Sequence, residues 1–150
     1  MRSPASLVRF RSAAPSDRSA VEALLTREQL PLEGVAEHFD TFVLAQRGEH
    51  VVGAAGLEVH GSFGLVRSVV VAPELKGQGL GRQLTHQLLA QARARGLEAV
   101  YLLTTTAPDF FAHLGFERLA REAAPAPLWA SAEFQGACPA SAIVMRLSLR

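Results

Sequence analysis

The fold of this chain is decided by residues 65–83, which read LVRSVVVAPELKGQGLGRQ. The stretch begins with a mostly β-branched, apolar run that is typical of a strand buried on both faces, and Pro73 ends this run. Gly77, Gly79 and Gly81 then allow positive φ angles and let the backbone come close to a ligand. The pattern predicts a strand, a loop and a helix whose free N–H groups suit an anion.

The charges and the glycine spacing narrow the choice of anion site. Lys76 precedes the expected helix and Arg82 falls in its first turn. Cations there oppose the helix dipole by roughly 0.3–1 kcal/mol each, and a bound phosphate would reverse that effect. The glycines are spaced G-x-G-x-G, unlike the dinucleotide fingerprint, and no G-K-[ST] of a P-loop follows. A glycine-rich turn that binds nothing is the alternative.

Two motifs together resemble the GNAT N-acetyltransferases. Residues 71–82 are similar to the family's acetyl-CoA pyrophosphate loop, with Lys76 where the family usually has Gln or Arg. Residues 107–116 resemble its short helix beside coenzyme A, which ends in Gly-Phe. The resemblance implies one α+β domain over residues 1–150. Its mixed, mostly antiparallel sheet should have six to seven strands, be flanked by helices and be splayed between strands four and five.

The same resemblance implies acetyl-CoA as cosubstrate and no metal. Backbone groups of Val69 and Val71 would bind the pantetheine arm, and an N–H near Val69 would stabilise the oxyanion, a role worth roughly 2.7–4 kcal/mol elsewhere. The residues expected to contact acetyl-CoA lie in the strand, the loop and the second motif: Val69, Val70, Val71, Lys76, Gly77, Gln78, Gly79, Leu80, Gly81, Arg82, Thr106, Phe110 and Phe111.

Acetyl transfer also needs a base, because an aliphatic amine is largely protonated near neutral pH. Glu58, near the end of the strand before the central one, and Glu133, in a segment expected to return over the same opening, are the candidates, with ordinary surface or ion-pair roles as the alternative. Many family members carry a Tyr at the position of Phe111 as the acid for the leaving thiolate. Here the thiolate would leave unassisted, or Ser141, Cys138 or a water would serve.

The acceptor is best argued from Arg67, a cation within an apolar strand that needs a carboxylate partner. The partner is either internal, Glu58 or Glu133, or the carboxylate of a substrate held bidentately. The residues expected to bind the acceptor are Arg67, Ser68, Thr104 and Thr105. Strand propensity alone would also explain the threonines. The family resemblance adds Glu33, Glu37 and His38 as candidates, with solvated loop charges as the alternative.

A closer resemblance covers nearly the whole chain. Its residues are similar to the arsenic-resistance branch of these enzymes, and through it to N-acetylglutamate synthase domains: 57–58, 65–68, 101–107, 110–111, 133–134 and 138–141. It implies acetylation of the α-amine of a small amino acid or an analogue, including an arsenical one. The alternatives are a polyamine or protein N-terminus as acceptor, or a coenzyme A-binding protein without turnover. The lone Cys138 is interpreted as a small apolar residue and not as an arsenic ligand.

The remaining elements follow from periodicity and turn residues. Further strands are expected at residues 7–11, 41–45, 51–59, 100–103 and 141–149, and one begins near 116. Helices are expected to open at 14–17, to run from 81 to a C-terminal Arg95-Gly96, to lie within 107–116 ahead of Gly115-Phe116, and to cover 128–134.

The composition of the chain argues against several classes of protein. A formal charge of +1 without a basic stripe argues against nucleic acid. One cysteine excludes an internal disulfide or a zinc–cysteine cluster and fits a reducing compartment. No apolar run nears the ~20 residues of a membrane span, and Met1–Pro4 has no apolar region behind it. We expect a cytoplasmic protein without membrane contact, and the family resemblance allows a homodimer.

Overall fold

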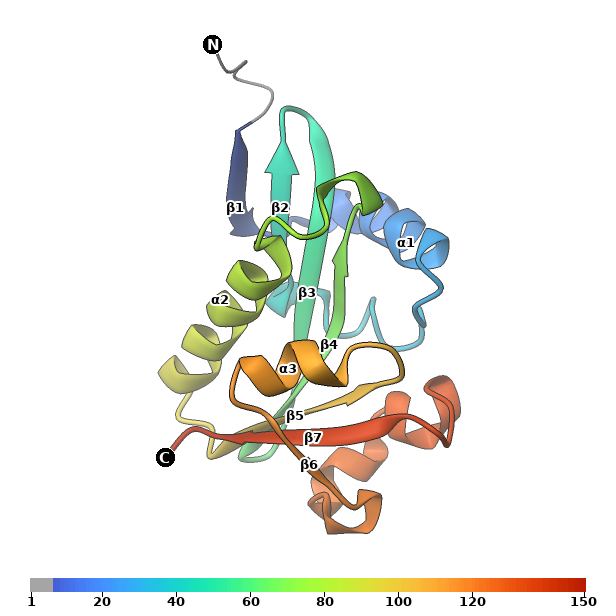
Figure 1. Ribbon diagram of the computed structural model, residues 1–150, viewed down its shortest axis with the longest axis vertical. Coiled ribbons are helices and arrows are strands. Elements are labelled where there is room, and N and C mark those ends of the chain that lie inside the picture. Colours follow the sequence, from blue (N-terminus) through green and yellow to red (C-terminus); the bar gives the residue numbers. More distant parts are fainter. Residues whose placement is uncertain (1–6) are drawn as a thin grey trace.

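A computed structural model describes residues 7–150. Met1–Pro4, where the sequence was searched for a leader, lies outside the described residues. The seven strands form one sheet in the order β1-β2-β3-β4-β5-β7-β6. Neighbouring strands are antiparallel except for the parallel pair β4 and β5, and helices flank the sheet (Figure 1). The predicted mixed, mostly antiparallel α+β fold is confirmed.

The elements lie close to their predicted positions. The strands are β1 (Val8–Ser12), β2 (Val43–Arg47), β3 (His50–His60), β4 (Phe63–Val71), β5 (Ala99–Thr104), β6 (Glu117–Leu119) and β7 (Ile143–Ser148). The α-helices are α1 (Arg18–Arg27), α2 (Leu80–Ala94) and α3 (Pro108–His113).

One expected helix is wrong. Residues 128–134 do not form an α-helix but belong to a 3₁₀ turn at Ala126–Ala130 and a π turn at Glu133–Ala137. Pro125 and Pro127 remove backbone donors from this segment, and Gly136 has a φ of 119° that no helix contains. The segment therefore folds as short turns that lie over one end of the sheet.

The core is built by the apolar stripe of α2 against the sheet. Leu84, Leu88 and Ala92 are fully buried and recur at helical spacing on one face of α2. The helix ends as expected, since Gly96 follows its cap with a φ of 75°. This packing fixes the start of α2, and with it the glycine loop, against the end of β4.

The sheet opens between β4 and β5. The two strands pair only from Phe63–Leu65 to Ala99–Tyr101 and then diverge, which confirms the predicted splay. A bulge lies in β4 at this level, because Arg67 pairs with Gly56 but Val70 pairs with Ala54. The bulge was not predicted. On its other side, β4 has no strand partner from Val66 onward in the described structure, because its pairing with β5 ends at Leu65.

Among residues 7–150, no helix combines the length and the apolar character required to cross a bilayer.

Candidate active site

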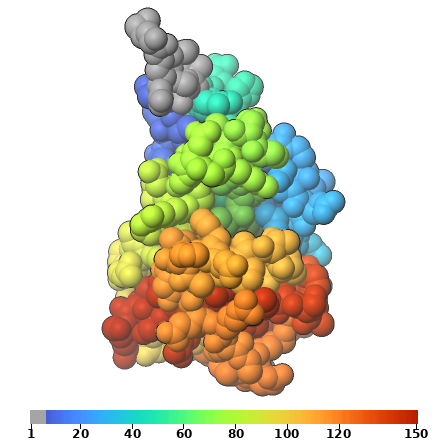
Figure 2. Space-filling view, in the orientation of Figure 1, coloured from blue at the N-terminus to red at the C-terminus, as the bar shows by residue number. Residues whose placement is uncertain are grey.

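A cavity of about 1120 Å³ fills the gap between the diverging strands. Its walls are β4, the glycine loop, the start of α2, the end of β5 and α3, and Figure 2 shows the surface hollowed between the green atoms of the loop region and the orange atoms of α3. Both predicted motifs therefore meet at one site. The lining contains every residue predicted to contact acetyl-CoA except Gln78, which is exposed.

The glycine loop has the geometry of an anion cradle. Gly77 and Gly79 have φ angles of 84° and 83°, and Gly79 is the residue that caps the start of α2. A Cβ built at either position would meet no atom within 4 Å, so the backbone conformation requires glycine there and the space in front is open. No described side chain caps the first turn of α2, which leaves its N–H groups for a ligand. These residues fit a pyrophosphate.

The cations at the loop differ in their surroundings. The Nζ atom of Lys76 lies 3.1 Å from Oε1 of Glu28, which follows α1, and both side chains line the cavity. Arg82 is exposed in the first turn of α2. The Glu28 contact, which the sequence did not predict, ties the loop to the end of α1.

The two aromatic residues of α3, Phe110 and Phe111, lie in different surroundings. Phe110 faces the loop, because a Cβ on Gly81 would lie 3.3 Å from its ring. Phe111 is buried and packs edge-to-face between Phe110 and Phe116, with ring centroids 4.9 and 5.8 Å away. Its position is thus occupied by a packing residue that has no proton to give to a leaving thiolate.

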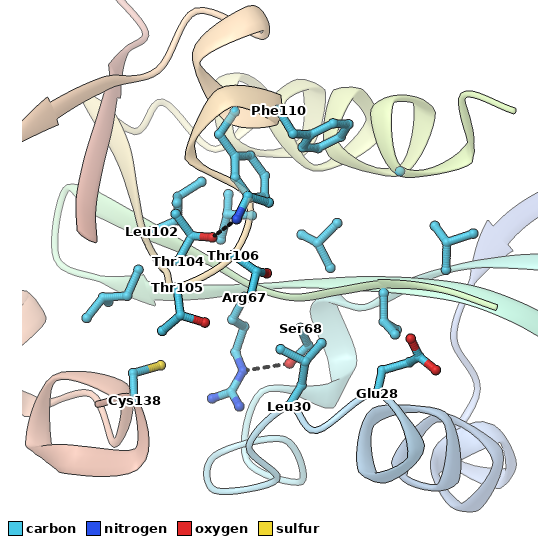
Figure 3. Close-up of a pocket in the computed structure, with 18 of the residues that line it drawn as sticks. Glu28, Leu30, Arg67, Ser68, Leu102, Thr104, Thr105, Thr106, Phe110 and Cys138 are labelled. Atoms are coloured by element: carbon cyan, nitrogen blue, oxygen red, sulfur yellow. Dashed lines mark hydrogen bonds between the residues drawn. The ribbon is translucent and has the colours of Figure 1, made fainter. Parts of the chain in front are cut away.

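Arg67 lies on the opposite wall and is 2% exposed. Its Nη1 donates to Oε2 of Glu58 at 2.6 Å and its Nε donates to Oγ of Ser68 at 3.1 Å. The third nitrogen, Nη2, is buried without a hydrogen-bond partner among residues 7–150 and lies 3.6 Å from Oε2 of Glu133. Figure 3 shows the guanidinium at the cavity with Cys138 and Leu30 on either side in that view.

Glu58 is not among the residues that line the cavity. It is 1% exposed and lies behind Arg67, where its Oε1 also contacts Nε2 of His60 at 2.7 Å. Burial alone would raise the pKa of Glu58, but hydrogen bonds from His60, Arg67 and Ser131 lower it below its usual value. Such a carboxylate stays ionised and holds Arg67 in place.

Glu133 differs from Glu58 both in its position and in the direction of its pKa shift. It lines the cavity, is 4% exposed, and burial raises its pKa to about 7 even though Arg67 acts against that rise. Cys138 also lines the cavity, and burial together with Glu133 raises the pKa of its thiol to about 12. Ser141 is exposed and lies outside the lining. The structure therefore brings Arg67, Glu133 and Cys138 together at one wall.

Residues 8–119, about three quarters of the chain, match the acetyltransferase (GNAT) family. The chain belongs to this family. The two motifs had predicted this membership.

Three named proteins are similar to this GNAT domain in sequence or in structure. The amino-acid acetyltransferase of Salmonella typhimurium is 30% identical over 104 residues, which are 68% of this chain but 22% of that protein. Rv2747 from Mycobacterium tuberculosis, solved in complex with CoA and a second ligand, has a TM-score of 0.78 and 26% identity, covering 95% of this chain and 99% of that one. N-acetylglutamate synthase from Neisseria gonorrhoeae, complexed with coenzyme A and N-acetyl-glutamate, shares the fold: TM-score 0.82, 20% identity, 97% of this chain and 36% of that chain.

The predicted acceptor residues of this GNAT domain converge on the cavity, which is lined by Arg67, Ser68, Thr104, Thr105 and Glu33. Glu37 is exposed outside the lining, and His38 lies behind the cavity near Glu58. Thr104 is also structural, because its Oγ1 accepts a hydrogen bond from the N–H of Ala107 at 3.1 Å (Figure 3).

Sequence reasoning missed how the loop before β2 closes this wall. Gly34 has a φ of 88°, and a Cβ there would lie 2.5 Å from Nη1 of Arg67. Only a glycine lets the backbone cross the Arg67–Glu58 pair so closely. The Leu32-Glu33-Gly34 turn in the sequence was a signal for a tight turn, but not for what the turn covers.

Proposed function

We propose that this enzyme transfers the acetyl group of acetyl-CoA to the α-amine of a small amino acid, or of an analogue that keeps the carboxylate, such as an arsenical amino acid. The observation that carries the proposal is the Nη2 atom of Arg67, a buried donor at the cavity wall without a hydrogen-bond partner in the described part of the chain. A donor left in that state costs about 1–3 kcal/mol, and more when it is charged. A carboxylate in the cavity would remove this cost.

The surroundings of Arg67 support an anionic acceptor group over a cationic one. Its other nitrogens are held by Glu58 and Ser68, so the free donor is fixed in direction and meets an incoming carboxylate at little entropic cost. A polyamine would bring more positive charge to a wall that already holds a guanidinium. The amino-acid acetyltransferase of Salmonella typhimurium, which matches 68% of this chain, agrees with this acceptor class.

In this proposal Glu133 is the base that accepts the proton of the amine. It faces the cavity, and a pKa of about 7 suits proton transfer near neutral pH better than that of a fully ionised carboxylate. The open edge of β4 at Val69 and Val71 would bind the pantetheine arm, and the N–H of Val69 would stabilise the oxyanion. Ser141 lies outside the cavity lining, and a Cys138 thiol whose pKa is raised to about 12 is too weak an acid to protonate a thiolate of pKa about 8.5, so the thiolate would leave unassisted or take its proton from water.

The test is release of free coenzyme A with acceptors offered in matched sets: an amino acid, its carboxamide and the corresponding decarboxylated amine. We expect the free acid to react best, with kcat/KM lower by on the order of 10²-fold for the other two, because a buried charge loses its partner. Equal kcat/KM values for the three members of a set would exclude Arg67 as the group that binds the carboxylate of the acceptor. Tight coenzyme A binding without turnover on any amine would favour a non-catalytic coenzyme A-binding protein.

The same assay distinguishes a substrate-binding role of Arg67 from a purely structural role. Arg67→Lys keeps a cation beside Glu58 but loses the planar fork. We expect it to raise KM for the amino acid several-fold or more and to leave KM for acetyl-CoA unchanged, whereas the exposed change Arg95→Lys should alter neither. Equal increases in both KM values would indicate a purely structural arginine.

A further inference from the structure

Two imidazoles and one carboxylate gather on the side of Glu58 that faces away from the acetyl-CoA cavity. Nε2 of His60 lies 2.7 Å and Nε2 of His38 lies 3.7 Å from Oε1 of Glu58. Among residues 7–150, these three ligand atoms form the one group of this kind, all within 4.8 Å of one another. Glu58 is buried, whereas the His38 and His60 side chains keep 24% and 16% exposure.

The backbone holds these three side chains in place. Glu58 and His60 are two residues apart on β3, so their side chains leave the same face of the strand. His38 lies in the turn before Phe39–Thr41, and Thr41 ties this turn to β3: its Oγ1 donates to the carbonyl of Leu57 at 2.6 Å and accepts from the Leu57 N–H at 3.0 Å. The ligand set is therefore organised before any ion arrives.

The second oxygen of the Glu58 carboxylate, Oε2, already has a hydrogen-bond partner. Oε2 of Glu58 accepts a hydrogen bond from Arg67 at 2.6 Å, which leaves Oε1 directed at the imidazoles. Metal-bound carboxylates are oriented by such outer hydrogen bonds. The charge of Arg67 is also met from its far side by Glu133 at 3.6 Å, which lessens its repulsion of a second cation.

We propose that His38, Glu58 and His60 bind one divalent transition-metal ion, with Zn²⁺ the best fit, at a site separate from the acetyl-CoA cavity. Neutral imidazole and carboxylate are its usual ligands, at about 2.0–2.2 Å, which places neighbouring ligand atoms about 3.3 Å apart. The present separations of 2.7 and 3.7 Å reach that value through small rotations of the two partly exposed rings. Water completes the coordination from the solvent side.

The test is calorimetric titration of the untagged full chain with Zn²⁺ near neutral pH, because metal binding competes with protons for its ligands. We expect one ion per chain. His38→Ala with His60→Ala should weaken binding by about 100-fold or more, since losing an outer partner alone costs about 10–100-fold. His86→Ala, which removes an exposed histidine of α2, should leave the affinity unchanged.

The double variant should keep the fold, because Glu58 retains Arg67 and Ser131 as partners, and its melting temperature without metal checks this. A wild-type titration without saturable binding would overturn the site, as would equal binding by the folded double variant. A simple hydrogen bond from His60 to Glu58 would then explain the contact. None of these readings depends on the acceptor of the acetyl group, so the proposed function stands or falls separately.

Discussion

One guanidinium at this site lies between two carboxylates whose environments differ. Glu58 receives hydrogen bonds from His60, Arg67 and Ser131, which lower its pKa, whereas burial raises the pKa of Glu133 to about 7. Carboxylates whose pKa values are pushed apart in this way commonly divide into a fixed ion and a group that exchanges protons. At the scale of single residues, the division assigns charge pairing to Glu58 and proton transfer to Glu133.

Glu133→Gln tests this assignment. The groups that face Glu133 are Arg67, Glu58, Cys138 and Glu33. Only the ionised form of Glu133 can accept a proton, so wild-type kcat/KM should fall as pH drops through about 7. The variant should lose about 10²–10⁴-fold in kcat/KM and should lose that limb of the profile.

The control for Glu133→Gln is Glu49→Gln, an exposed carboxylate in the turn between β2 and β3, which should leave the profile unchanged. A Glu133→Gln enzyme with the wild-type pH profile would exclude Glu133 as the base.

Part of this residue-scale arrangement could be predicted. A buried arginine demands a carboxylate, and the sequence predicts Glu58 or Glu133 as the internal partner; the structure places Glu58 at 2.6 Å and Glu133 at 3.6 Å. The bulge beside Arg67 could not be predicted, because Ser68 has a φ of 58° and no glycine marks the position. Such a backbone conformation is imposed by the surrounding sheet and leaves no trace in local composition.

At the scale of elements, the loop before α2 combines two requirements in one short stretch. It ends a buried strand and starts a helix, and it must keep its N–H groups accessible, which glycines achieve without a capping side chain. The bounds of α2 were predicted well because an apolar stripe and a terminal Gly96 mark them. Residues 121–142 were predicted poorly because prolines and small residues give no period.

Gly79→Ala and Gly96→Ala make a matched pair for this loop. Both glycines have positive φ, 83° and 75°, and a Cβ at either would meet no atom within 4 Å. Each change should cost about 1 kcal/mol or slightly more in unfolding free energy, because alanine is disfavoured in that conformation. Calorimetry should show weaker acetyl-CoA binding for Gly79→Ala only. Equal affinity in the two variants would contradict the phosphate cradle.

The junction of β1 and α1 depends on a second charged pair. Arg11 donates to both oxygens of Asp17 at 2.8 and 2.9 Å, and Asp17 also accepts the N–H of Ala14 at 2.7 Å. The hydrogen bond from Arg11 is the main reason that the pKa of Asp17 falls to about 2. This contribution to stability is present above the usual pKa of Asp and is lost as pH falls through about 2.

Asp17→Asn should therefore lower the free energy of unfolding by about 1 kcal/mol near neutral pH. The difference from wild type should shrink as pH drops below about 4. Urea unfolding of both proteins across this range measures it. A constant difference down to pH ~3 would show that the ion pair contributes nothing.

At the scale of the whole molecule, two arms of the sheet are joined through only three residue pairs between β4 and β5. Beyond these pairs the cavity separates the arms, so a ligand there touches β4 and the loop on one side and β5 and α3 on the other. The splay was predicted from the family resemblance. The position of β7 between β5 and β6 was not, since pattern alone does not specify which non-consecutive strands pair.

Hydrogen exchange with and without coenzyme A should report this arrangement. Amides of residues 69–71 and 77–82 should gain protection, because backbone N–H groups on the open edge and in the loop would hold the ligand. Amides of β1 and β2, which do not line the cavity, serve as the internal control. Protection confined to α3 would mean that coenzyme A is gripped by side chains and not by the loop.

The place of β7 has a consequence for how the protein is made. Ile143–Ser148 emerges from the ribosome after β5 and β6, yet it must pair with both of them on opposite edges. Until then β6 has no neighbour in the sheet and β5 keeps one edge bare. Translation proceeds at about 5–20 residues per second, so a nascent chain exposes that bare edge of β5 for seconds before Ile143–Ser148 pairs with it.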